Sequence, residues 1–141
     1  MSSPLQPQDA RLPDKAPADG TGPCPCILIV EDEPILAIDL RYIFQDNGYA
    51  VLGPATSVDM ALRLLNSARP DVAVLDVNLR GQTVTPVAER LRNLQIPFFL
   101  SSAYEAEQLQ AIDLLANREN VRKPFNEEQL LAAARRALGA P

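Results

Sequence analysis

Four apolar runs of the sequence each end in polar residues that could do chemistry. The residues that follow these runs are, in chain order, Glu31-Asp32-Glu33, Asp76, Ser101-Ser102 and Lys123-Pro124. If the runs are parallel strands, their carboxyl ends lie along one edge of a sheet, so these side chains would come together there. Carboxylates that converge repel each other and need a cation. An oxygen-only ligand set favours a hard ion such as Mg²⁺, with Mn²⁺ as an alternative.

A carboxylate beside a divalent ion, an ammonium group and a hydroxyl is suited to phosphoryl transfer. The ion and the ammonium group neutralise charge on the phosphoryl oxygens, and the hydroxyl donates a hydrogen bond to one of them. In this interpretation Glu31 and Asp32 hold the metal, and Asp76 is the nucleophile that forms an aspartyl phosphate. Ser102 and Lys123 would then hold the transferred group.

The 141 residues include no histidine, which excludes several classes of chemistry. Ser-His-Asp and Cys-His catalysis, imidazole metal sites and phosphohistidine carriers all need that side chain. The net charge of -5 argues against direct binding of nucleic acid or of an anionic membrane surface. Cys24 and Cys26 are too close in sequence for an unstrained disulfide. Without further Cys or His they do not form a zinc site, so we interpret them as inert thiols.

The first 25 residues differ in composition from the rest of the chain. They hold Pro4, Pro7, Pro13, Pro17, Pro23 and Pro25 and almost no large apolar side chain. We therefore expect a disordered tail over residues 1–25 and one folded domain over residues 26–139. No stretch reaches the roughly 18 apolar residues of a membrane span, and the N-terminus lacks the apolar centre of a signal peptide. We expect a cytoplasmic protein with no membrane insertion.

The folded part alternates short apolar runs with helical periods. Strands are predicted at residues 27–30, 49–55, 71–76, 96–101 and 121–122. Helices are predicted from Pro34 to the Asn47-Gly48 stop, after an N-cap at Ser57, at 84–94, at 105–116, and from Asn126 to Leu138. The predicted inward faces are Ile35, Ile38, Leu40, Ile43 and Phe44 in the first helix, and Ala61, Leu62, Leu65 and Ala68 in the second. Five such β-α units predict an α/β fold with a doubly wound, five-stranded parallel sheet and helices on both faces.

Four motifs in this order resemble the receiver domain of bacterial two-component response regulators. They are Ile-Leu-Ile-Val-Glu31-Asp32-Glu33-Pro34, Val-Leu-Asp76-Val-Asn78-Leu-Arg-Gly81, Ser102-Ala103 and Lys123-Pro124-Phe125, and the likeness covers residues 26–139. The resemblance implies a flavodoxin-like sheet of order 2-1-3-4-5 with Asp76 as the phosphoacceptor. It implies Glu31, Asp32, Asp76 and the backbone carbonyl of Asn78 as metal contacts. It also implies Ser102 as the switch hydroxyl and Lys123 as the invariant lysine.

The segment 99–104 is similar to a Phe-x-x-Thr-Gly-Tyr-like segment found in stand-alone receivers. Here Ser102 replaces the threonine and Ala103 the glycine, and the hydroxyl is kept. Many receivers carry on strand five an aromatic residue that couples to this hydroxyl. Aligned from Lys123, that position is Asn120, which leaves Tyr104 as the aromatic candidate for the switch.

The sequence thus predicts a single-domain response regulator rather than an enzyme, although it would assist its own phosphorylation and dephosphorylation. A partner histidine kinase or phosphotransfer protein would phosphorylate Asp76, and a downstream protein would read the surface around the fourth helix, the fifth strand and the fifth helix. One alternative is a pseudo-receiver adaptor that is never phosphorylated, which predicts a broken acidic pocket. A flavodoxin-like cofactor binder would need a Gly- or Ser/Thr-rich loop after the first strand, where this chain has acids. A carboxylate-based phosphatase would need Asp-x-Asp, which Asp76-Val77-Asn78 does not provide.

Overall fold

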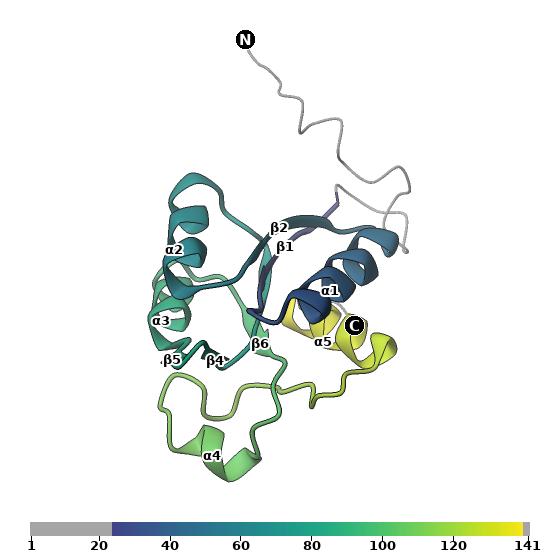
Figure 1. Cartoon of the computed structure of the whole chain (residues 1–141). Helices are drawn as coiled ribbons and strands as arrows, with labels where there is room; N and C mark the ends of the chain where they lie inside the picture. The colour runs from purple at the N-terminus through teal and green to yellow at the C-terminus, as the bar shows by residue number, and fades with distance from the viewer. Residues whose placement is uncertain (1–23, 140–141) are drawn as a thin grey trace.

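A computed structural model describes residues 24–139 of the chain. Their centre is a parallel sheet with the order β2-β1-β3-β6 (Figure 1). Its strands are β1 (Cys26–Val30), β2 (Ala50–Ala55), β3 (Val72–Leu75) and β6 (Phe98–Leu100). The order of these four agrees with the first four positions of the predicted sheet. The tail predicted over residues 1–25 lies outside the described residues except for its last two.

The fifth strand, predicted at residues 121–122, is reduced to a single parallel bridge between Leu100 and Asn120. The Leu100 N–H donates to the carbonyl of Glu119, and the Val121 N–H donates to the carbonyl of Leu100, each at 2.8 Å. The chain therefore runs beside β6 for about one ladder step and then leaves it at Lys123-Pro124, where proline has no N–H to continue the ladder.

Residues 24–139 form five helices, four of which cover the two faces of the sheet. They are α1 (Pro34–Asp46), α2 (Val58–Ser67), α3 (Thr85–Asn93), α4 (Ala106–Gln110) and α5 (Glu127–Ala137). Figure 1 shows α1 and α5 on one face of the sheet and α2 and α3 on the other. Two separate buried clusters result, and successive residues of a strand alternate between them: Leu28 joins the α2–α3 cluster and Ile29 the α1–α5 cluster. Strands buried on both faces explain why the apolar runs show no alternation in the sequence.

Three helices begin at side-chain caps. Ser57 accepts a hydrogen bond from the Met60 N–H at 3.1 Å, and Asn126 accepts one from the Gln129 N–H at 3.2 Å, so both predicted N-caps are confirmed. Glu33 caps α1 by accepting from the Leu36 N–H, and Pro34 occupies the first helical position as predicted. These caps fix where each helix starts relative to the strand end before it.

Part of the predicted inward faces is wrong. Ile35 is 68% exposed and Ile38 45% exposed, whereas Ala37 is buried in their place. Leu40 and Phe44 are fully buried as predicted, and Ile43 is partly buried. In α2 the helix ends at Ser67, so Ala68 is its exposed C-cap rather than an inward residue. The outward side of α1 therefore carries apolar side chains.

Two local structures after β3 and β6 also differ from the prediction. A small antiparallel hairpin, β4 (Asn78–Leu79) and β5 (Gln82–Thr83), follows the acidic end of β3. Its two turn residues, Arg80 and Gly81, both have positive φ (53° and 86°), as a tight two-residue hairpin turn requires. The helix predicted at 105–116 is only the five-residue α4, followed by turns.

Candidate functional site

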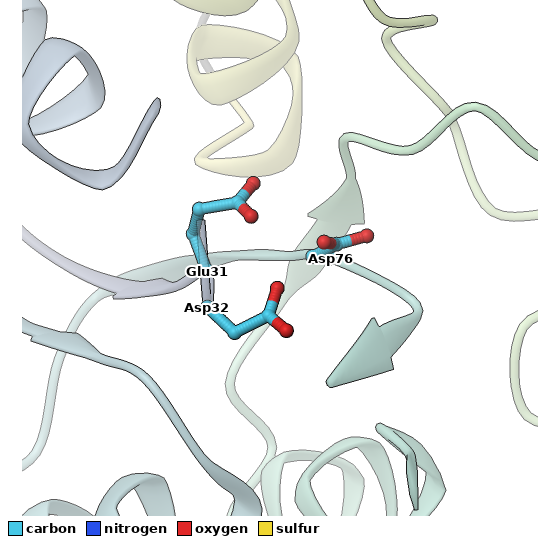
Figure 2. Close-up of side chains that lie close together, drawn as sticks. All are labelled: Glu31, Asp32 and Asp76. Carbon is cyan, nitrogen blue, oxygen red and sulfur yellow. The ribbon is translucent and has the colours of Figure 1, made fainter. Parts of the chain in front are cut away.

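The acidic residues meet at the carboxyl edge of the sheet because β1 and β3 are neighbours. Val30 pairs with Leu75, so the residues that follow them, Glu31 and Asp76, emerge side by side. The Asp76 N–H donates to the carbonyl of Val30 at 2.9 Å, which continues the ladder as far as Asp76. Figure 2 shows the carboxylates of Glu31 and Asp32 extending toward the side where Asp76 lies. One oxygen from each of the three falls within 4.8 Å of the others.

Lys123 contacts two of these acids. Its Nζ lies 2.8 Å from Glu31 Oε1, in an ion pair without hydrogen-bond geometry, and donates to Asp76 Oδ2 at 3.1 Å. The Lys123 N–H donates to the carbonyl of Ser102 at 3.1 Å, which fixes the lysine backbone against the end of β6. The Lys123-Pro124 bond is cis. The three side chains are nearly buried, since Glu31 is 1%, Asp76 11% and Lys123 17% exposed.

Burial shifts the titration of this cluster. It raises the pKa of Glu31 to about 7, assisted by the charge of Asp76 and opposed by Lys123 and the Glu33 N–H. For Lys123, burial is the largest single influence and lowers the pKa. The close contact with Glu31, the charges of both acids and the hydrogen bond to Asp76 together outweigh it, so the pKa of Lys123 is raised. The lysine is therefore charged at neutral pH, while Glu31 is poised to gain or lose its proton there.

The donor set fits a hard divalent cation. Three carboxylates face one ammonium group, and oxygen ligands of this kind suit Mg²⁺ and Mn²⁺. Two of the acids open onto a groove of about 380 Å³, whereas the buried Glu31 does not line it. The groove is lined by Asp32, Asp76, Asn78, Arg80, Gly81, Ala103, Tyr104 and Lys123. Asp32 Oδ2 accepts a hydrogen bond from the Arg80 N–H at 3.0 Å, so the β4–β5 turn holds this carboxylate in place.

Ser102 is hydrogen-bonded to the backbone of Lys123, but its hydroxyl makes hydrogen bonds to residues outside the acidic cluster. Ser102 is fully buried and is not among the residues that line the groove. Its Oγ donates to Asn120 Oδ1 at 3.2 Å and accepts from the Tyr104 N–H at 3.3 Å. Tyr104, the other predicted switch residue, is half-buried in the groove lining.

The structure thus gathers Glu31, Asp32, Asp76 and Lys123 into one cluster, as the sequence predicted, with Asn78 in the same groove. The residue that sequence reasoning missed is Asn120, which it treated only as the place of a missing aromatic ring. An asparagine in the predicted fifth strand was the available sign, because asparagine is rare in strands and needs a hydrogen-bond partner where it is shielded from water.

Comparisons with known proteins agree with this geometry. Residues 27–135 match the family model described as the response regulator receiver domain. The chain is 32% identical over 115 residues to the sensory transduction protein LytT of Oceanobacillus iheyensis (78% of this chain, 46% of that protein). It is 35% identical over 120 residues to the positive alginate biosynthesis regulatory protein of Pseudomonas aeruginosa (79% and 46%).

Among solved structures, the response regulator PhyR from Brucella abortus superposes with a TM-score of 0.73 at 29% identity, covering 82% of this chain and 48% of that one. The chain therefore spans about half the length of these three relatives. Within residues 24–139 the helices are all too short or too polar to cross a membrane. The shared fold, the match across the domain and the acidic edge lead to one assignment: this chain belongs to the receiver domain family of two-component response regulators.

Proposed function

We propose that this receiver domain accepts a phosphoryl group on Asp76 from a partner histidine kinase or phosphotransfer protein in the cytoplasm. Mg²⁺, or Mn²⁺ in its place, would be held by Glu31, Asp32, Asp76 and the backbone carbonyl of Asn78. The observation that carries the proposal is the convergence of three carboxylates and one lysine at the carboxyl edge of the sheet. Burying charged groups is energetically unfavourable, so we do not expect such a cluster in an adaptor that is never phosphorylated.

The protein contributes to this reaction mainly by positioning the reacting groups and by neutralising charge. A carboxylate oxygen of Asp76 attacks the phosphorus of a phosphohistidine in line; the new P–O bond forms as the P–N bond breaks, and the imidazole nitrogen leaves with the bonding electron pair. The divalent ion, when bound, supplies positive charge to the phosphoryl oxygens. Lys123, which already touches Asp76, supplies the second cation. The Ser102 hydroxyl would donate to a phosphoryl oxygen once it turns from its present partner.

The outward face of α1 is suited to the phosphoryl donor. Ile35, Ile38 and Tyr42 lie on one side of this helix at spacings of three and four residues and are 68%, 45% and 55% exposed. The helix starts directly after the acidic residues, so a protein seated on this face would lie beside Asp76. A helix of the kinase or phosphotransfer protein with its own apolar stripe would cover it.

The output is proposed to be a contact with a separate effector protein, as in stand-alone receivers. The support for this type is the segment 99–104 with its serine in place of threonine. The domain would take part in its own phosphorylation and dephosphorylation only by holding the reacting groups, and it would have no other substrate.

The test is labelling with acetyl phosphate in the presence of Mg²⁺, read by intact mass. We expect one phosphoryl group on the wild-type protein and none on Asp76→Asn, which keeps the size of the side chain and removes the nucleophile. Beryllofluoride with Mg²⁺ should shift amide NMR signals in the wild type alone. A wild-type protein that shows no Mg²⁺-dependent change with either reagent would contradict the proposal and favour the adaptor.

A further inference from the structure

Asn120 links the candidate switch hydroxyl to the chain that leads into α4. Its backbone is held in register beside Leu100 by the two bonds of the isolated bridge, so its side chain reaches the residues just beyond β6. Asn120 Oδ1 accepts from both the N–H and the Oγ of Ser102, at 3.1 and 3.2 Å. Asn120 Nδ2 donates to the carbonyl of Tyr104 at 3.3 Å. One amide thus spans the whole Ser102–Tyr104 turn.

This arrangement needs an amide. The Ser102 N–H requires an acceptor and the Tyr104 carbonyl requires a donor, and these two backbone groups together fix which way the amide of Asn120 points. A carboxylate offers only acceptors, and an aliphatic or phenylalanine side chain offers neither. The asparagine at this position therefore supplies both an acceptor and a donor on one short side chain.

The Ser102 hydroxyl can serve only one acceptor at a time. It has a single proton, which it donates to Asn120 Oδ1. A phosphoryl group on Asp76 presents charged oxygens, and hydrogen bonds to charged acceptors are stronger than hydrogen bonds to a neutral amide. If the hydroxyl turned to such an oxygen, Asn120 would lose one of its three bonds, and the Tyr104 N–H would lose its partner on Ser102 Oγ.

The segment that follows, which we call the α4 segment (residues 104–117), contributes only two buried side chains, Leu109 and Leu115, to the core. Figure 1 shows α4 on an extended loop at the edge of the domain. A cavity of about 340 Å³ lies beneath it, lined by Asn120 together with Leu109 and Leu115 from the segment itself. The ion pair between Glu105 and Arg122 that spans this region is more than half exposed at both ends, so it contributes little to holding the segment.

We propose that Asn120 is the positioning residue that couples phosphorylation of Asp76 to the α4 segment. On phosphorylation the Ser102 hydroxyl would stop donating to Asn120 and donate to the phosphoryl group instead, while Asn120 keeps its hydrogen bond to the Tyr104 carbonyl. The inference rests on the proposed function, and it goes beyond that function by assigning the coupling to an amide. It places the change of surface at the α4 segment rather than in the ring of Tyr104.

The test compares amide NMR spectra with and without beryllofluoride and Mg²⁺. In the wild type we expect shifts both around Asp76 and throughout the α4 segment. In Asn120→Leu, which matches asparagine in shape and makes no hydrogen bond, we expect the shifts around Asp76 to remain and those of the α4 segment to be lost. Asn117→Gly is the matched control: it removes an amide from the same cavity, does not touch Ser102, and suits the positive φ of that residue.

Each outcome separates the two proposals. A wild type without any response contradicts the proposed function itself. A full α4 response in Asn120→Leu overturns the role of Asn120 and leaves the proposed function intact. If Asn120→Leu does not fold, Asn120→Asp decides, because it keeps the acceptor for Ser102 and removes only the donor to the Tyr104 carbonyl. An α4 response that survives in Asn120→Asp would overturn the coupling, and its loss would support it.

Discussion

Binding of Mg²⁺ to this domain should release a proton, and the source should be Glu31. The structure buries this carboxylate beside Asp76, and burial raises its pKa to about 7 from an ordinary value of 4.5. A protonated carboxyl is a poor ligand for a hard cation, so the ion must displace the proton. The perturbation is therefore a change of pH around neutrality, with Glu31→Gln as the variant that removes the titrating group.

The size of the effect follows from the pKa. With a pKa of about 7, roughly a tenth of Glu31 is ionised near pH 6 and roughly nine tenths near pH 8. The apparent Mg²⁺ affinity should therefore be about tenfold weaker near pH 6 than near pH 8, which corresponds to about 1.4 kcal/mol. At neutral pH about half a proton should leave for each ion bound.

Isothermal titration calorimetry measures both quantities. Titrations near pH 6 and near pH 8 give the affinities, and titrations at one pH in two buffers with different ionisation enthalpies give the number of protons released. Glu31→Gln should bind more weakly and with no pH dependence, whereas Glu33→Gln, which changes a neighbouring exposed acid, should behave like the wild type. Equal wild-type affinities at the two pH values would refute the reasoning, and a pH dependence that persists in Glu31→Gln would assign the proton to another group.

Three further outcomes are expected. Without Mg²⁺, the free energy of unfolding should fall as the pH rises from about 5 to about 8, by up to about 3 kcal/mol. The reason is that the folded state, with the higher Glu31 pKa, binds more protons than the unfolded state in this range. Urea titrations at several pH values would check this, and a free energy of unfolding that increases with pH would contradict it. Lys123→Met should lower the free energy of unfolding at neutral pH by about 3 kcal/mol, because two nearly buried acids lose their counterion, and thermal denaturation should show partial recovery on addition of Mg²⁺. Ile38→Ser should slow phosphoryl transfer from a cognate kinase at least about tenfold while stability stays within about 0.5 kcal/mol, and labelling by acetyl phosphate should be unchanged; slower labelling would indicate a damaged site instead of a lost docking contact.

The sheet and the acidic edge could be predicted because both depend on local patterns. Apolar runs that alternate with helical periods predict a parallel sheet, and the residue after each run lies at its carboxyl edge. Asp76 and Glu31 needed no knowledge of packing to be placed together. Lys123 needed only the position of the fifth chain segment, which a single bridge is enough to set.

The orientation of α1 could not be predicted in the same way. Its first turns contain Ile35 and Ile38 as well as Ala37, and apolarity alone favours the larger side chains as the inward face. The structure buries Ala37 instead, which turns both isoleucines outward. Large apolar residues on an exposed face are more often selected for binding than for folding, so this error of prediction falls on the surface proposed for the kinase.

The α4 segment and Asn120 depend on contacts between distant parts of the chain. A helical period over 105–116 does not show that only five residues become helical, because the rest of the segment is shaped by turns over a cavity. The three hydrogen bonds of Asn120 join residues 16 and 18 positions apart, so no local pattern contains them. What the sequence offered was one polar residue at a position where an apolar ring is usual.

The charges of the site also suggest the order of events. Three carboxylates and one ammonium group leave an excess of negative charge, and burial raises the pKa of Glu31, so a proton on this carboxyl can neutralise part of that charge near neutral pH. In that condition Lys123 is shared between Glu31 and Asp76. A divalent ion on Glu31 and Asp32 would take over the neutralisation of Glu31, so Lys123 could turn wholly to Asp76 and to the incoming phosphoryl oxygens. Metal binding should therefore precede phosphorylation. Loss of Lys123 should slow transfer to Asp76 while leaving Mg²⁺ affinity equal or stronger, because the ion would no longer compete with an ammonium group for the same acids.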